Sequence, residues 1–328
     1  MYDHYIAVDY AQSNMAIARM TRHSTKIAVI EVKSSIKELQ FYLSRLKGKK
    51  ILTIEETTTS QWLYAELREY VDEIIVCDPY RNRLLSDGPK TDKLDAAKLV
   101  VLLKGNLLKP VFHSGEGFFY LRKIVSGYED VIKAGVRALN QRSALLRGTG
   151  KDKREKVLED AKERFIMTGI DEAIDLYERQ KERYAEEFHR IWKQYGQVKN
   201  LESIPGIGEI GAVKIAAIVV SARRFENRGH FLSYCGLIKL EKISGGKSYG
   251  KRNPRYCRVL KSVFKTAAVT VIDKDADNPF AEYYRYLIKE KCYAKHNARN
   301  KVARRIAVVA YGILKSNKQF NRKMLAKA

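Results

Sequence analysis

Short β-prone runs and segments of helical spacing alternate through the first 110 residues, and their order limits the possible folds more than any other feature. Three β-prone runs come first, and helices and strands then alternate. The predicted elements are strands over residues 5–10, 15–20, 26–32, 51–54 and 73–77, and helices over residues 34–46, 60–70 and 91–103. The order β-β-β-α-β-α-β-α predicts an α/β domain with a mixed sheet covered by helices.

Four acidic residues fall where such a sheet would bring them together. Asp9 lies in the first strand, Glu55 ends its expected parallel neighbour, and Asp92 and Asp95 share one face of the last helix. The element order is that of the RNase H-like superfamily, and these are the positions where that fold keeps its metals. Converging carboxylates suit Mg²⁺, with Mn²⁺ as the alternative. Such metals can activate an attacking oxygen and stabilise the leaving oxygen of a phosphodiester.

Two alternatives compete with this interpretation. Thr91 could cap the last helix, and the acids of its first turn could interact favourably with the helix dipole. This alternative explains Asp92 better than Asp95. Glu56 adjoins Glu55, and strand alternation lets only one of the two face a metal. Asp78 and Asp87 are nearby, and we interpret them as structural or peripheral.

The positive charge is concentrated at one end of the chain. Of the net charge of +24, residues 201–328 carry +18, from 27 Lys and Arg against nine Asp and Glu. Such a concentration predicts a phosphate-backbone partner and salt-sensitive binding. No stretch approaches the roughly 18 apolar residues of a membrane span. Four widely separated cysteines predict reduced thiols, and we expect a cytoplasmic protein associated with the bacterial nucleoid.

Two heptad-like seams in residues 111–200 predict a helical coiled-coil arm between a first domain at 1–110 and a third at 201–328. Apolar residues step by three and four from Leu121 to Leu146 and again from Ile170 to Val198. An arm of this kind could pack on itself or on a second subunit, and an ordinary helical bundle would have the same pattern.

The last third is expected to be mainly α-helical and to bind nucleic acid. Its Pro205-Gly206-Ile207-Gly208 turn is typical of a helix-hairpin-helix element, in which Gly206 and Gly208 let backbone amides approach a phosphate. Ser244 follows in a glycine-rich basic loop. It could act as a nucleophile, or the loop could contact phosphates without any catalytic role. The cations expected to contact the backbone are Lys247, Lys251, Arg252, Arg255, Arg258, Lys295, Arg299, Arg304 and Arg305.

The chain resembles transposases of the insertion sequence 110 family and, more distantly, the related pilin-gene DNA invertase. The resemblance covers almost the whole chain. Its motifs are Ile6–Asp9, Ile54–Thr57, Lys90–Ala96, Ile204–Gly208, Gly236-Leu237, Ser244–Lys247 and Lys301–Ala307. Ile238-Lys239 stands where the family usually has a nearby proline, and Asn253-Pro254 replaces a common glycine, which alters the expected loop shapes.

The resemblance implies a RuvC-like tetrad of Asp9, Glu55, Asp92 and Asp95 and a serine nucleophile, Ser244. It also implies that a structured non-coding RNA, the bridge RNA, pairs with donor and target DNA, so that base pairing selects the sites. The two catalytic sets would meet within one subunit or across a dimer or tetramer. The alternatives are a DNA invertase, a metal-dependent nuclease that uses only the carboxylates, and a non-catalytic nucleic-acid scaffold.

Overall fold

The computed structural model divides into two compact units, Met1–Phe119 and Tyr120–Ala328. It describes residues 1–80, 91–113, 116–152, 158, 160–274 and 277–325. The predicted boundary at residue 200 falls inside a short helix, Gly196–Glu202, which packs on the helix that follows it within the second unit.

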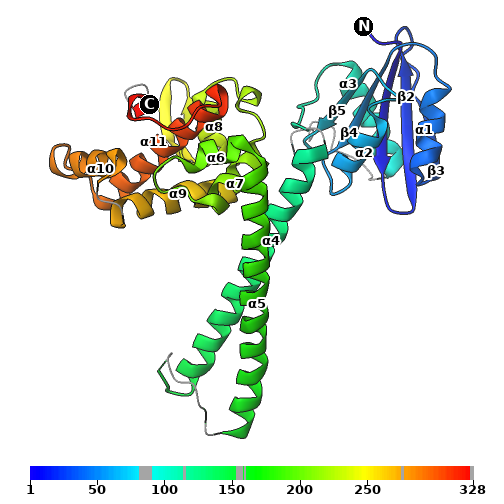
Figure 1. The fold of residues 1–328 in the computed structure, drawn as a ribbon. Coiled ribbons are helices and arrows are strands. Elements are labelled where there is room, and N and C mark those ends of the chain that lie inside the picture. Colours follow the sequence, from blue (N-terminus) through cyan, green and yellow to red (C-terminus); the bar gives the residue numbers. More distant parts are fainter. Residues whose placement is uncertain (81–90, 114–115, 153–157, 159, 275–276, 326–328) are drawn as a thin grey trace. The chain divides into compact units, whose positions relative to one another are not determined.

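The first unit is an α/β domain built on a five-stranded mixed sheet (Figure 1). The strand order is β3-β2-β1-β4-β5, with β1 antiparallel to β2, β2 antiparallel to β3, and β1, β4 and β5 parallel. The elements are β1 His4–Tyr10, β2 Asn14–Thr21, β3 Ala28–Lys33, α1 Ile36–Ser44, β4 Lys50–Glu55, α2 Ser60–Leu67, β5 Glu73–Cys77 and α3 Asp92–Lys104. The predicted element order is confirmed.

Alternation along the strands divides the core between the two faces of the sheet. Ile6 and Val8 of β1 belong to the apolar cluster formed with α1 and α2. Ala7, between them, belongs to the cluster formed with α3, whose Ala96 is completely buried. Helices α1 and α2 therefore cover one face, and α3 covers the other.

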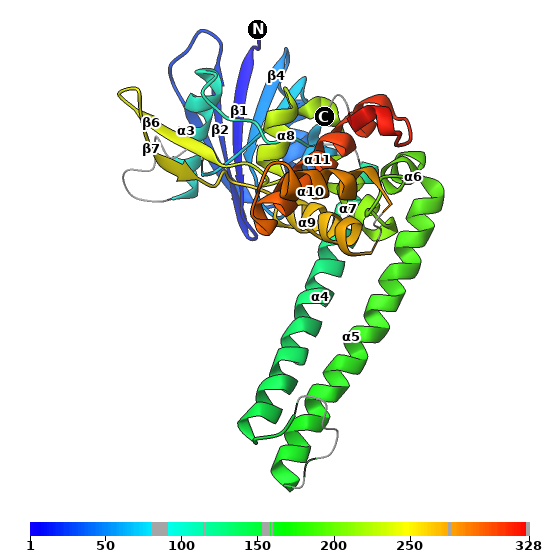
Figure 2. The same ribbon diagram turned by 90° about the vertical axis from the view of Figure 1, so that its left-hand side faces the viewer.

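A long helical hairpin of α4 (Glu116–Gly148) and α5 (Ala161–Gln194) lies in the region where the sequence predicts a helical arm (Figures 1 and 2). All of it except the first residues of α4 belongs to the second unit. The helices meet closely where small residues face tyrosines. A Cβ at Gly135 would lie 2.2 Å from the ring of Tyr177, so this position admits only glycine. Tyr128, Tyr184 and Phe188 form a cluster of edge-to-face and tilted rings where the first half of α4 faces the end of α5.

The rest of the second unit is mainly helical, as predicted. Its helices are α6 Gly196–Glu202, α7 Glu209–Val219, α8 Arg228–Tyr234, α9 Arg258–Asp273, α10 Pro279–Lys289 and α11 Lys295–Ser316, with short 3₁₀ helices η2 Ala222–Arg224 and η3 Arg322–Leu325. Two strands, β6 Leu240–Ser244 and β7 Lys247–Arg252, form a separate antiparallel hairpin. No helix in the described ranges is long and apolar enough to cross a membrane.

Two parts of this unit differ from what their local sequence predicts. The helical spacing of the basic residues predicts one long helix over residues 289–315, but α10 ends at Lys289 and α11 starts at Lys295, because Cys292 between them takes a left-handed backbone conformation with φ of 51°. The polar composition of residues 316–328 predicts a disordered tail. Instead, Phe320 stacks on Phe280 and donates its backbone N–H to Ser203, which anchors the tail.

Candidate functional site

Asp9 and Glu55 lie at the carboxyl ends of neighbouring parallel strands. Val8 of β1 pairs with Ile54 of β4, so the next residue of each strand falls at the same level. Ala7 and Ile51 pack in the cluster under α3. Asp9 lies two positions after Ala7 and Glu55 four positions after Ile51, so each acid is on the same face of its strand as that buried residue. The side chains of Asp9 and Glu55 therefore leave the sheet on the α3 side.

Asp92 and Asp95 come to this side from the first turn of α3. Thr91 caps the helix by accepting a hydrogen bond from the backbone N–H of Leu94, at 3.3 Å. Asp95 is half-buried, and it adjoins Ala96, which packs against the sheet. The capping interpretation of Thr91 is thus confirmed, and the same cap starts the helix at the point where both acids lie beside the sheet.

The pKa of Asp9 reflects its burial and the proximity of Asp92 and Asp95. Burial raises the pKa of its carboxyl from 3.8 to about 6, and the charges of Asp92 and Asp95 add to that effect. Each neighbouring carboxylate makes ionisation of Asp9 harder because like charges repel in a partly desolvated site. The structure therefore brings three of the four predicted acids within electrostatic reach, and the strand register adds Glu55.

The donor set suits a hard divalent cation in its chemistry, since every candidate ligand is a carboxylate oxygen. Among the described residues, however, no three Asp, Glu, His or Cys side chains stand close enough to hold one ion together. Ligation by this set would require the carboxylates to turn towards a common point.

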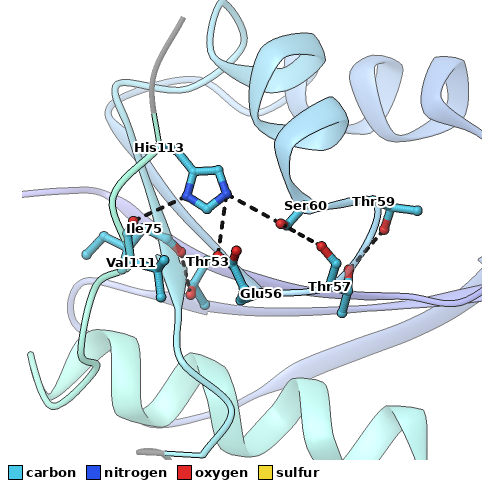
Figure 3. Close-up of polar contacts among 8 residues, drawn as sticks. All are labelled: Thr53, Glu56, Thr57, Thr59, Ser60, Ile75, Val111 and His113. Atoms are coloured by element: carbon cyan, nitrogen blue, oxygen red, sulfur yellow. Dashed lines mark hydrogen bonds and ion pairs between the residues drawn. The ribbon is translucent and has the colours of Figure 1, made fainter. Parts of the chain in front are cut away.

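Glu56 contacts His113 (Figure 3), and it follows Leu52 and Ile54, whose side chains pack under α1 and α2 on the face opposite α3. Its carboxylate lies 3.5 Å from Nε2 of His113, whose side chain is only 5% exposed. The same ring nitrogen lies 3.4 Å from Oγ of Ser60, the first residue of α2, and the ring packs on Tyr64 of that helix. Alternation along the chain therefore leaves Glu55 as the glutamate that faces α3.

The two weaker acidic candidates do not join this group. Asp78 accepts a hydrogen bond from the backbone N–H of Tyr80 at 3.0 Å, which stabilises the turn after β5. Asp87 lies outside the described residues.

Ser244 is the last residue of β6, directly before a two-residue turn. Gly245 and Gly246 have φ values of 54° and 74°, and Ser244 pairs with Lys247 across the turn. Positive φ at both central residues is the requirement of a type I′ turn, which explains the glycine pair. The sequence was interpreted as a basic loop, but the segment is a β-hairpin; the Gly-Gly pair between two runs of residues was the available signal.

The hydroxyl of Ser244 is presented to solvent. Every residue of β6 and β7 is exposed, and Ser244 lines a hollow of about 350 Å³ together with Glu241, Lys242, Ile243, Tyr249 and Arg252. Ser248 differs, because its Oγ donates a hydrogen bond of 2.8 Å to the carboxylate of Glu241. Within the described chain, Ser244 has no such side-chain partner.

Most of the predicted backbone-binding cations are exposed on this unit. They are Lys247, Lys251, Arg252, Arg255, Arg258, Lys295, Arg299 and Arg304. Arg305 is the exception, because it is engaged inside the domain. Its guanidinium donates to the carbonyl of Leu325 at 2.6 Å and lies over the ring of Tyr283. The expected role of Arg305 in nucleic-acid binding conflicts with this placement, and we assign it to anchoring the tail.

The two glycines of the Pro-Gly-x-Gly turn have different surroundings. Gly206 has φ of 84°, and a Cβ there would lie 2.6 Å from the carbonyl oxygen of Ala267, so glycine is needed for packing on α9. Gly208 is exposed and immediately precedes α7. Glu209 places a carboxylate in the first turn of α7, 3.1 Å from His189. The turn joins α6 to α7 as expected, while phosphate binding by its amides stays a prediction.

Residues 198–285 match the family model described as Transposase IS116/IS110/IS902 family. The matched segment runs from α6 into α10 and contains the Pro-Gly-x-Gly turn, Ser244 and the β6–β7 hairpin. The acidic residues of the first unit lie outside it. No curated protein matches the chain.

Proposed function

We propose that the chain, which belongs to the IS116/IS110/IS902 transposase family, cuts and rejoins DNA through Ser244 with help from the acidic site of its first unit. Transposases of this family act on DNA, and a recombination role follows from the family. The observation that carries the finer proposal is Ser244 itself. It lies inside the matched segment, at a turn, with an exposed hydroxyl among cations.

In the proposed step, Oγ of Ser244 attacks a DNA phosphorus atom. A phosphoserine ester bond forms, and the bond from phosphorus to the leaving deoxyribose oxygen breaks. The leaving oxygen takes the bonding electron pair and gains a proton, while the serine proton passes to a base. Rejoining is the reverse reaction with a hydroxyl from another DNA end, so the phosphodiester count is conserved.

The cations of the hairpin suit this step. Lys242 and Arg252 line the same hollow as Ser244, and Lys247 pairs with Ser244 across the turn. Positive groups beside a scissile phosphate attract the polyanion and stabilise the extra negative charge of the transition state.

The first unit is proposed to be an RNase H-like, specifically RuvC-like, domain in which Asp9, Glu55, Asp92 and Asp95 hold Mg²⁺, with Mn²⁺ as a substitute. Support comes from the strand order β3-β2-β1-β4-β5 and from the convergence of these acids on the α3 side. The bound metal would supply charge stabilisation and activation of an oxygen. The carboxylates themselves would orient the ions, and the cations would relieve the repulsion that adds to burial in raising the pKa of Asp9.

A structured guide RNA and a homo-oligomer, a dimer or a tetramer, complete the proposal. The net charge of +18 in residues 201–328 suits long sugar-phosphate backbones. Selection of sites by RNA pairing would leave the protein to hold backbone.

The proposal is tested by looking for a covalent protein–DNA adduct. Purified protein is incubated with Mg²⁺, DNA carrying the element ends and RNA transcribed from the flanking non-coding sequence, and the products are separated on a denaturing gel. We expect an adduct with the native chain and with Ser248→Ala, and a loss of at least about 1,000-fold with Ser244→Ala. Asp9→Ala should abolish the same adduct.

Two outcomes would replace the proposal. Full strand cleavage by Ser244→Ala, together with none by Asp9→Ala, would identify a metal-dependent nuclease. Tight DNA binding with no adduct and no cleavage on any substrate would identify a scaffold. Recombination between inverted repeats around the gene would keep the serine chemistry and favour an invertase.

A further inference from the structure

A basic groove lies between α9 and α11, at the base of the β6–β7 hairpin. Its cavity volume is about 710 Å³. One wall is α11 and another is α9, and Lys251 of β7 and Asn253, just after that strand, line the side towards the hairpin. We refer to this feature as the α9–α11 groove. Figure 2 shows the hairpin in yellow extending from these helices.

The lining of the groove is cationic and contains no carboxylate. Its six basic residues are Lys239, Lys251, Lys261, Lys265, Lys301 and Arg304. None of them forms an ion pair within the part of the chain that the structure describes. Cations that gather around a concave surface without acidic neighbours repel one another, and an anionic ligand relieves that repulsion.

Two of these lysines are held in place by aromatic rings. The ammonium of Lys261 lies 4.1 Å from the ring centroid of Tyr256, and that of Lys301 lies 4.5 Å from the ring centroid of Tyr293. Both lysines are half-buried. Such contacts position a cation without neutralising it, so each charge stays available to a ligand.

Uncharged polar side chains also line the groove. His296, Asn297 and Asn300 lie along the same side of α11 as Lys301 and Arg304. Amide side chains carry both a donor and an acceptor, which matches the edges of nucleic-acid bases and the oxygens of sugars. Tyr293 adds an aromatic surface at the rim, and bases stack on such surfaces.

The size of the groove selects among nucleic acids. Its volume is that of a small-molecule pocket, which is typically about 300–1,000 Å³. A cavity of this volume matches a few nucleotides of one strand better than a complete duplex. A charged groove with an aromatic rim is the usual arrangement for a single strand.

We propose that the α9–α11 groove binds one strand of nucleic acid and leads it to the hairpin that carries Ser244. The choice of nucleic acid as the ligand rests on the proposed function. Lys251 belongs to β7, which pairs directly with the strand that ends at Ser244, so a strand in the groove lies against the base of the same hairpin. The binding residues added to those expected from the sequence are Lys239, Lys261, Lys265 and Lys301.

The test measures binding by full-length protein carrying Ser244→Ala, so that no cleavage intervenes. Fluorescence anisotropy is recorded with a labelled 12-nucleotide DNA strand, the matching RNA strand and a 20-base-pair DNA duplex. The groove variant combines Lys261→Ala, Lys301→Ala and Arg304→Ala. The matched control combines Lys162→Ala, Arg179→Ala and Lys193→Ala, three exposed cations of α5. A second groove variant, Lys265→Glu with Arg304→Glu, changes only exposed side chains and guards against misfolding.

Both groove variants should bind the single strands at least about 30-fold more weakly, and the control should change affinity less than about threefold. Because each lost phosphate contact removes about 0.7 from the slope of log K against log salt, the triple groove variant should lose about 2 units. Equal losses for DNA and RNA would show that the shared backbone is recognised, and a larger loss for one of them would identify the bound strand.

Unchanged single-strand affinity in a folded groove variant would overturn the inference, and so would an equal loss of duplex binding. The result is separable from the proposed function. An adduct formed by the native chain alongside unaffected binding by the groove variants would refute the groove alone. Groove-dependent binding without any adduct would refute the serine chemistry alone.

Discussion

The carboxylate site of the first unit and the Ser244 hairpin of the second place reactive groups on opposite kinds of scaffold. Asp9 extends from β1, which is hydrogen-bonded to strands on both sides and whose Ile6 and Ala7 are completely buried. Ser244 lies on a two-stranded hairpin in which every residue is exposed. An isolated hairpin of two strands is marginally stable in water.

The difference fits the role proposed for each group. Like charges that repel can be kept together only by a scaffold whose own core stabilises it against that repulsion, and the buried sheet provides one. Ser244, as the proposed nucleophile, needs access to DNA instead, and an exposed turn provides it. We therefore expect the backbone that carries the acids to be rigid before DNA binds, with only the carboxylate side chains turning, and the hairpin to gain order with its partner.

The largest expected effect is the difference in stability loss when the same Ile→Ala substitution is made in each of the two scaffolds. Ile54→Ala in β4 removes a side chain that is 1% exposed and should cost about 2–4 kcal/mol of unfolding free energy in the first unit. Ile243→Ala in β6 removes one that is 66% exposed and should cost less than about 0.5 kcal/mol. Hydrogen exchange read peptide by peptide reports each unit separately. Similar costs at the two sites would contradict the comparison.

A smaller effect concerns the charge of Asp9. Its folded pKa of about 6 exceeds the ordinary 3.8, so the folded state binds the extra proton between these values and loses stability as pH rises through them. The cost is complete above about pH 6. Asp9→Asn should therefore stabilise the first unit at pH 7.5 by about 1–2 kcal/mol, after allowing for solvent screening, and by little near pH 4.

Thermal unfolding at the two pH values measures this difference. Mg²⁺ offers a second readout, since added metal should raise the melting temperature of the native chain and not that of Asp9→Asn. Asp130→Asn, on the exposed surface of α4, serves as the control. A stabilisation by Asp9→Asn that is the same at pH 4 and pH 7.5 would exclude repulsion as its cause.

The smallest global effect is expected from the hairpin turn. Gly246→Ala forces a side chain into φ of 74° and should cost about 1–2 kcal/mol within the hairpin. Because β6 and β7 pair with each other, the amides of this hairpin should exchange faster while the melting temperature of the chain barely changes.

Gly169→Ala is the matched control. Gly169 lies inside α5, where a Cβ meets nothing within 4 Å, so alanine should stabilise the helix by about 0.5–1 kcal/mol. A loss of global stability in Gly246→Ala would show that the hairpin supports the domain core. It would contradict the view that the hairpin is an independent, exposed element.

Periodicity allowed most of the first unit to be predicted. Strand alternation and helical spacing are local properties, so the element order and the Thr91 cap follow from neighbouring residues alone. The hairpin was missed because Glu241, Lys242 and Lys251 give its strands no apolar alternation. The break before α11 was missed because Cys292 adopts a conformation that its residue type does not favour.

Residue types and spacing by themselves determined which groups are available: four acids at the ends of strands and a helix, a serine before two glycines, and a basic last third. The tertiary structure decided which of them meet. It placed Glu55 on the α3 side and Glu56 beside His113, because the two faces of the sheet bury different clusters. It also placed Arg305 inside the domain, where it donates a hydrogen bond to Leu325, and it placed Lys261 and Lys301 in one groove. Such proximity depends on the packing of segments far apart in the chain, which no local pattern contains.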